Sequence, residues 1–134
     1  MRCLPDVALP SDMPFWVSRN AFVEHFDQED FLCRGAKEVE HCYLPEWFHE
    51  HAGITRFLLP TVQFIGGKTQ FISGRHRTAV LLTYLKELPM SFSCINKPPQ
   101  AFFDRSGLRP LSLQSLIELP DLPRIDLTAI TTRS

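Results

Sequence analysis

The chain has 134 residues, and its 14 Lys+Arg against 15 Asp+Glu give a formal net charge of −1. Its 44% hydrophobic and 22% charged residues exclude wholesale disorder, and the length favours a single domain over 1–134. The balanced charge excludes a strongly basic protein that coats nucleic acid, because neutralising phosphates requires an excess of Lys and Arg. A local basic patch stays compatible with this balance.

No stretch reaches the roughly 18 consecutive apolar residues of a membrane span, and the N-terminus has no apolar run typical of a secretion signal. We therefore expect a cytoplasmic location and no membrane partner. The cysteines form no Cys-x-x-Cys pair, so we expect reduced, mostly buried thiols instead of disulfides. The four are Cys3, Cys33, Cys42 and Cys94.

Short elements are predicted along the first third of the chain. The run Phe15-Trp16-Val17 is β-prone, and Ser18 is a typical N-cap for a helix that buries Phe22 and Phe26. The expected elements are an irregular arm over 1–14, a strand over 15–17, a helix over 19–26, an acidic connector over 27–30 and a brief strand over 31–33.

A second helix is predicted from Pro45, which suits a first helical turn, to Gly53, which suits a C-cap. The preceding residues, 37–41, fit either a helix start or a loop. Leu44, Trp47, Phe48 and His51 would share the inner face of the helix.

Two β-rich segments, Thr61–Ile65 and Lys68–Ile72, flank the pair Gly66-Gly67. Both central residues of a type I′ turn need positive φ, so this pattern predicts a hairpin. The rest of the chain predicts a helix over 75–88 ended by Pro89, a strand over 90–95, a break at 97–99, a turn at 104–107, a helix over 111–119 and an extended tail over 120–134. The fold class is therefore α+β, with helices packed on a small mixed sheet.

The segment Ser73-Gly74-Arg75-His76-Arg77-Thr78 carries the clearest chemical signal. It places three basic side chains at a helix N-terminus, where each costs about 0.3–1 kcal/mol against the macrodipole. A bound anion would reverse that cost, since Gly74 permits close backbone approach, two guanidiniums can fork a phosphate, and Thr78 adds a hydroxyl. The other interpretation is a simple strand-to-helix turn whose basic side chains are solvated or paired with Glu residues.

The run Thr69-Gln-Phe-Ile-Ser-Gly-Arg-His-Arg-Thr-Ala-Val-Leu-Leu, followed by Leu88-Pro89-Met90, resembles the phosphate-binding box of the ParB/sulfiredoxin-like superfamily. Within it, Gly-Arg-His-Arg after a hairpin is most similar to the plasmid fertility inhibition factor (Osa-like) group. The resemblance covers about residues 15–95. It implies a ParB/sulfiredoxin-like fold and phosphate binding at Ser73, Gly74, Arg75, His76, Arg77 and Thr78.

The same resemblance sets the functional expectations. Arg75 stands where sulfiredoxins carry their catalytic Cys, which excludes sulfinic-acid reductase chemistry, and the chain has no room for the helix-turn-helix domain of ParB proteins. Members of the fertility inhibition group are associated with ATPase and nuclease activity and with blocking conjugative DNA transfer. We therefore expect a nucleotide with Mg²⁺ as ligand, His76 as a proton-transfer residue, and a protein partner from a DNA-transfer system. Nucleic acid is a weaker candidate partner. The alternative is a non-catalytic interaction module that inhibits or regulates a partner.

Two further groups of side chains contain potential metal ligands. His41, Cys42, His49 and His51 include zinc-ligating types, but His49 and His51 would point to different faces of a helix, so we expect no metal site. A nuclease or NTPase needs a carboxylate for Mg²⁺, and Glu46 and Glu50 would share a helix face, although such a pair is usually a solvated helix surface. The sequence alone identifies no catalytic acid. The upstream carboxylates are Glu38, Glu40, Glu46 and Glu50.

Overall fold

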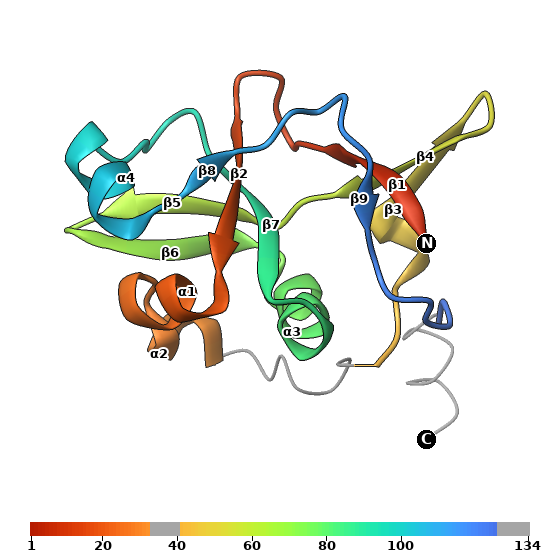
Figure 1. The fold of residues 1–134 in the computed structure, drawn as a ribbon, viewed down its shortest axis with the longest axis horizontal. Helices are drawn as coiled ribbons and strands as arrows, with labels where there is room; N and C mark the ends of the chain where they lie inside the picture. Colours follow the sequence, from red (N-terminus) through yellow and green to blue (C-terminus); the bar gives the residue numbers. More distant parts are fainter. Residues whose placement is uncertain (33–40, 126–134) are drawn as a thin grey trace.

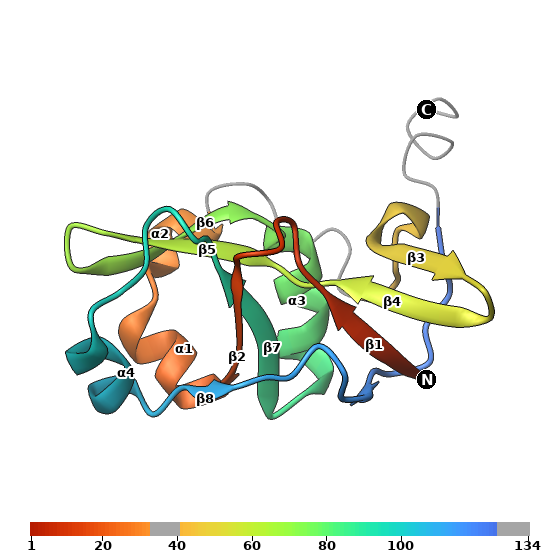
Figure 2. The same ribbon diagram turned by 90° about the horizontal axis from the view of Figure 1, so that it is seen from above.

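The computed structural model describes residues 1–32 and 41–125, and it shows a mixed α+β fold with two small sheets (Figure 1). No helix of the described residues is both long and apolar enough to cross a bilayer. The sheets lie side by side, and one chain segment passes directly from the first to the second (Figure 2). The sequence led us to expect one mixed sheet, whereas the structure has two.

The first sheet has the strand order β3-β4-β1-β9. β1 runs parallel to β4, while β3 and β9 pair antiparallel with their neighbours, so the sheet is mixed. Its strands are β1 (Arg2–Asp6), β3 (Phe48–His51), β4 (Ile54–Leu58) and β9 (Ile117–Glu118).

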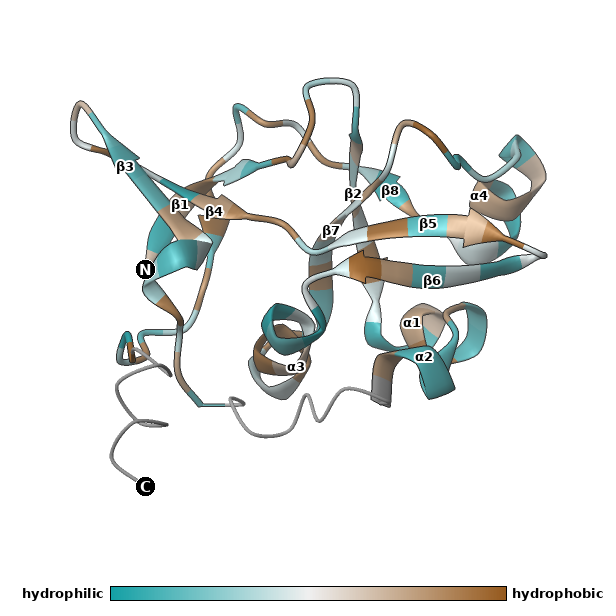
Figure 3. Ribbon diagram, turned by 180° about the vertical axis from the view of Figure 1, so that it is seen from behind, coloured by the Kyte–Doolittle hydropathy of each residue, from teal (hydrophilic) through white to brown (hydrophobic). Residues whose placement is uncertain are grey.

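The second sheet has the order β6-β5-β7-β2-β8, with β5 parallel to β7 and the other pairs antiparallel. Its strands are β2 (Met13–Ser18), β5 (Thr61–Ile65), β6 (Lys68–Ser73), β7 (Glu87–Phe92) and β8 (Arg109–Pro110). The predicted hairpin is confirmed, and Gly66 and Gly67 have φ of 60° and 79°. Hydrophobic and hydrophilic residues follow one another in bands along β5 and β6 (Figure 3).

Four α-helices and one 3₁₀ turn complete the described residues. α1 begins after Ser18 as predicted, and the Ser18 hydroxyl oxygen accepts a hydrogen bond from the Ala21 amide at 3.1 Å. The elements are α1 (Arg19–His25), α2 (Gln28–Leu32), η2 (Pro45–Trp47), α3 (Arg75–Tyr84) and α4 (Gln100–Ser106).

The core is aromatic, as the eleven Phe residues suggest. Phe22 is fully buried, and its ring centroid lies 5.1 Å from that of Phe26 and 5.3 Å from that of Phe31. Under the first sheet, Tyr43 packs edge-on against Phe48 at 5.1 Å. These residues belong to one buried cluster that includes residues from both sheets.

The N-terminal prediction was wrong, because residues 2–6 form a strand and the next strand begins at Met13, inside the expected arm. Pro5 suggested irregular structure, but β9 pairs only with Arg2 and Cys3. The missing N–H of Pro5 therefore falls beyond the part of β1 that β9 covers, where a proline is tolerated.

The prediction for residues 27–33 was also wrong, since Gln28–Leu32 is a short helix. The Asp27 carboxylate accepts a hydrogen bond from the Asp30 amide at 3.1 Å, which caps the start of that helix. Cys33 lies outside the described residues, as do residues 37–40 of the ambiguous segment.

The helix predicted from Pro45 to Gly53 is a single 3₁₀ turn followed by the β3–β4 hairpin. Gly53 was interpreted as a helix C-cap, but its φ of 77° and the Ala52 φ of 52° form the hairpin turn instead. Positive φ serves both structures, so glycine alone does not distinguish them. Trp47 and Phe48 are buried as predicted, while His51 is exposed.

Two element boundaries predicted between residues 75 and 95 were wrong. α3 ends at Tyr84 instead of Leu88, and the following strand is Glu87–Phe92 instead of 90–95. Pro89 lies inside that strand opposite Trp16, and β5 pairs with β7 only at Ser91 and Phe92. The break at 97–99 is confirmed.

The helix predicted over 111–119 does not form, and α4 occupies Gln100–Ser106 instead. Pro99 is the N-cap residue of α4, and Gly107, with φ 68°, is its C-cap, so residues 104–107 are a helix end and not an isolated turn. Residues 120–125 are extended and docked, since the Tyr43 amide donates to the Pro123 carbonyl at 2.8 Å. The tail beyond Ile125 lies outside the described residues.

Candidate anion-binding site

Gly74 forms the tight turn between β6 and α3. Its φ is 98°, and a Cβ at this position would lie 2.6 Å from the Pro60 Cα atom. Only glycine combines this left-handed conformation with such a close approach of backbone to backbone. The turn therefore fixes the first residues of α3 against the segment that joins the two sheets.

The N-terminus of α3 has the electrostatic character that the sequence predicts. Its first turn contains no acidic residue, and no side chain caps it. The first helical bond runs from the Thr78 amide to the Gly74 carbonyl at 2.8 Å, so the amides of Arg75, His76 and Arg77 have no carbonyl partner within the helix. This end is a region of positive potential with free N–H donors.

A cavity of about 420 Å³ opens at this helix end. Part of its lining is formed by Gly74, Arg75, His76 and Arg77, and another part comes from Leu44 and the 3₁₀ turn that follows it. The complete lining is Leu44, Glu46, Trp47, Ile72, Gly74, Arg75, His76 and Arg77. The cavity thus lies between the start of α3 and the 3₁₀ turn, and its wall is partly basic and partly apolar.

Arg77 is the unusual residue of this wall, because it is charged and only 7% exposed. Its Nη2 atom lies at the 3.5 Å limit of a hydrogen bond to the Ser73 hydroxyl, and its Nε atom has no hydrogen-bond partner among the described residues. Burial lowers the pKa of the guanidinium to about 10, an effect that the charge of Glu46 partly opposes. The group is therefore still cationic at neutral pH and presents a buried, under-satisfied donor.

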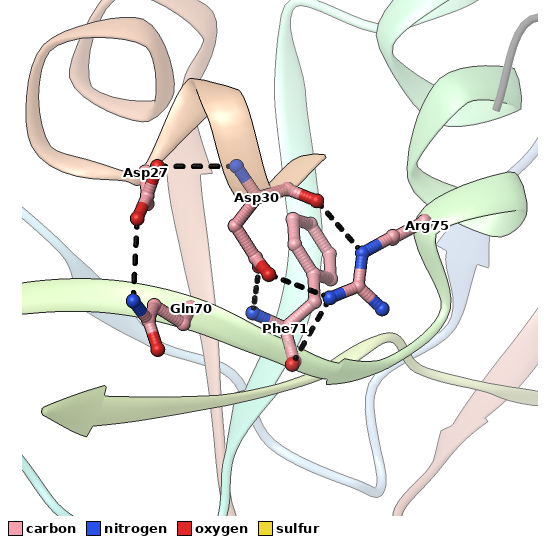
Figure 4. Close-up of polar contacts among 5 residues, drawn as sticks. All are labelled: Asp27, Asp30, Gln70, Phe71 and Arg75. Atoms are coloured by element: carbon pink, nitrogen blue, oxygen red, sulfur yellow. Dashed lines mark hydrogen bonds and ion pairs between the residues drawn. The ribbon is translucent and has the colours of Figure 1, made fainter. Parts of the chain in front are cut away.

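Arg75 lines the same cavity but has partners on α2 (Figure 4). Its Nη2 atom donates to the Asp30 carboxylate at 2.7 Å and its Nε atom donates to the Asp30 carbonyl at 2.9 Å. The Asp30 carboxylate also accepts from the Phe71 amide at 2.7 Å. Because the ion pair is mostly shielded from solvent, it ties α2, β6 and α3 together at the rim of the cavity.

The six predicted site residues are therefore arranged unequally. Gly74, Arg75, His76 and Arg77 line the cavity. Ser73 and Thr78 do not, since the Thr78 hydroxyl is fully buried and donates to the Gly74 carbonyl at 2.8 Å. The structure thus brings the central four residues of the box together on one wall.

The upstream carboxylates are separated by the fold. Glu46 lines the cavity, whereas Glu50 lies on β3 and accepts from Arg124 at 3.1 Å. The shared helix face that we expected for Glu46 and Glu50 does not exist, because the segment is not a helix. Glu38 and Glu40 lie outside the described residues.

The histidines around position 50 belong to a strand, so His49 and His51 share a face of β3 instead of pointing apart. The Nδ1 atom of His49 lies 3.2 Å from the Asp6 carboxylate, within hydrogen-bond distance. No group of three or more His, Cys, Asp or Glu side chains that could hold a metal is found among residues 1–32 and 41–125.

Sequence reasoning missed three contributors to the site. Asp30 looked like part of an acidic connector, and 45 residues separate it from its partner Arg75. Pro60 supports Gly74, and Trp47 was interpreted only as a core residue, although it also lines the cavity. No local spacing signals these contacts, because the residues that meet are far apart in the sequence.

Comparisons with protein-family models, with curated proteins and with solved structures find no match for this chain.

Proposed function

We propose that the cavity at the start of α3 binds the phosphate of a nucleotide, with a nucleic-acid phosphate as the weaker candidate. The observation that carries the proposal is Arg77, a buried cation that lines the cavity and whose Nε–H has no partner among the described residues. A phosphate oxygen would accept from the guanidinium of Arg77 and would also offset the cost of burying its charge. The free amides of the first turn of α3 supply further donors.

The apolar part of the lining supports a nucleotide over inorganic phosphate. Leu44, Trp47 and Ile72 lie on the wall with the basic residues. A free phosphate ion gains nothing from apolar surface, whereas a base or sugar attached to it can pack there. The mixed lining is therefore suited to a phosphoester whose organic part contacts the apolar side.

Mg²⁺ fits this proposal through Glu46. Magnesium in proteins is commonly held by one or two carboxylates together with substrate phosphates, and Glu46 is a carboxylate on the cavity wall. When bound, the ion would supply charge neutralisation at the phosphate. In a nucleotide-hydrolysing or DNA-cleaving reaction, His76 is the proposed proton-transfer group, since its imidazole lines the same cavity.

The resemblance of residues 69–90 to the ParB/sulfiredoxin-like box extends the proposal to that fold family and, within it, to a role like that of plasmid fertility inhibition factors. The partner would then belong to a DNA-transfer system. One observation favours the alternative of a non-catalytic interaction module. Arg75 is already paired with Asp30, which leaves less free positive charge for a ligand than the sequence suggests.

The test is a calorimetric titration with ATP, with CTP and with plasmid DNA, each with Mg²⁺, on the wild type and on Arg77→Met. We expect nucleotide binding in the wild type and a loss of at least tenfold in the variant. Methionine keeps most of the side-chain length, and it removes a buried, under-satisfied charge whose burial costs free energy. R77M is therefore expected to unfold at the same temperature as the wild type or above it.

Arg19→Met is the matched control, because Arg19 also begins a helix but is exposed and does not line the cavity. Its affinity should equal that of the wild type. Equal binding by the wild type and R77M would contradict the proposed site. Absence of binding to every nucleotide and to DNA would favour the interaction module.

A further inference from the structure

Two carboxylates offset the positive charge of the cavity. Counting histidine as neutral, Arg75 and Arg77 contribute two positive charges. Asp30, bonded to Arg75, and Glu46, on the cavity wall, contribute two negative charges. A helix end that looks strongly basic in the sequence is therefore close to neutral once the chain is folded.

The first carboxylate, Asp30, competes with a ligand for Arg75. It holds the guanidinium through a 2.7 Å ion pair and a 2.9 Å bond to its carbonyl, and the Arg75 side chain is only 17% exposed. An anion that draws Arg75 toward the cavity must weaken this pair. An anion that leaves the pair intact meets a guanidinium whose charge is already compensated.

The second carboxylate, Glu46, acts electrostatically on Arg77. Both residues line the cavity, and the charge of Glu46 favours the protonated guanidinium against the effect of burial. Glu46 is exposed, so it can respond to what the cavity holds. A bare anion placed beside Arg77 also meets the repulsion of this carboxylate, whereas an anion that arrives with a cation does not.

We propose that Asp30 and Glu46 determine the specificity of the cavity by suppressing the binding of a bare anion, so that the preferred ligand is a phosphate accompanied by a positive charge. This inference rests on the proposed phosphate site. Each carboxylate acts as a counter-charge to one arginine. Neutralising either of them should raise the affinity for a metal-free anion.

The experiment measures binding of inorganic pyrophosphate in the presence of EDTA, and again with Mg²⁺ in excess. The proteins are the wild type, Asp30→Asn, Glu46→Gln and Arg77→Met, with Glu50→Gln as the matched control. Glu50 is a carboxylate paired with an arginine, as Asp30 is, but it lies on β3 away from the cavity. Without metal, D30N and E46Q should each bind about three- to tenfold more tightly than the wild type, and E50Q should match the wild type.

With Mg²⁺, the order should reverse for E46Q, because the variant lacks the carboxylate that would share the cation. E46Q keeps the inference testable if D30N perturbs the packing of α2, since Glu46 is exposed. Metal-free binding by E46Q that equals or falls below that of the wild type would overturn the inference. If the wild type and R77M bind pyrophosphate equally under both conditions, the proposed phosphate site itself fails, which is a distinct result.

Discussion

At the scale of single residues, burial changes the chemistry of ionisable side chains far from the cavity as well. Cys3 is 1% exposed in the middle of the first sheet, and burial raises the pKa of its thiol from 9.0 to about 11. In the unfolded chain the thiol loses its proton near pH 9, whereas the folded protein keeps it until near pH 11. The unfolded state is therefore favoured progressively as pH rises through this window.

Cys3→Ala removes this pH-dependent contribution. The free energy of unfolding of the wild type, relative to C3A, should fall by about 1 kcal/mol between pH 7.5 and pH 10. Urea unfolding of both proteins at pH 7.5, 9 and 10, in the presence of a reductant, measures the difference. A gap between the two proteins that stays constant over this range would contradict a buried thiol with a raised pKa.

At the scale of elements, two glycines with similar φ have different roles. Gly67, at the tip of the β5–β6 hairpin, has φ 79° with open space around it, whereas Gly74 has φ 98° and lies against Pro60. An alanine at either position adopts a left-handed conformation at a cost of about 1–2 kcal/mol. At Gly74 its Cβ also clashes with the Pro60 backbone, and overpacking typically costs a further 1–3 kcal/mol.

We therefore expect Gly74→Ala to be destabilised by about 1–3 kcal/mol more than Gly67→Ala in chemical denaturation. G74A should also bind nucleotide more weakly, since the clash displaces the start of α3 from the cavity, while G67A should bind like the wild type. Equal stability losses in the two variants would show that the contact between Gly74 and Pro60 does not constrain the turn.

The elements that the sequence predicted well are those whose signals are local. Ser18 caps α1 through its own hydroxyl, and Gly66-Gly67 form a hairpin turn with no help from distant residues. The box at 74–77 also formed as expected, because a strand, a glycine and a helix follow one another directly. β1, by contrast, exists only through pairing with β4 and β9, which begin 52 and 115 residues later, so no pattern near Arg2–Asp6 indicates it.

The same distinction applies to the candidate site. Its basic wall is contiguous in sequence and was predictable, whereas its opposite wall and its counter-charge come from other elements. Glycines 53 and 107 were misinterpreted because positive φ serves a hairpin turn and a helix end equally. Which of the two forms is decided by tertiary packing of the neighbouring apolar residues.

At the scale of the whole molecule, the two sheets are joined by continuous hydrogen bonding. The Leu59 amide donates to the Asp6 carbonyl at 3.0 Å in the first sheet, and the Pro60 carbonyl accepts from the Ser91 amide at 2.9 Å in the second. Pro60 also packs against Gly74, so the segment that joins the two sheets contacts the turn that begins α3. The geometry of the cavity thus depends on both sheets holding their relative positions.

This arrangement predicts that the sheets unfold together, which two single-tryptophan variants can test. Trp47 reports on the first sheet from the 3₁₀ turn and is 4% exposed, and Trp16 reports on the second sheet from β2. In Trp16→Phe and in Trp47→Phe, the thermal midpoint from fluorescence should equal the midpoint from far-UV circular dichroism. Comparing two signals within each variant removes the effect of the substitution on overall stability. A fluorescence midpoint in either variant that differs by several degrees from its circular dichroism midpoint would mean that one sheet melts alone. The cavity between α3 and the 3₁₀ turn would then be lost in that first step.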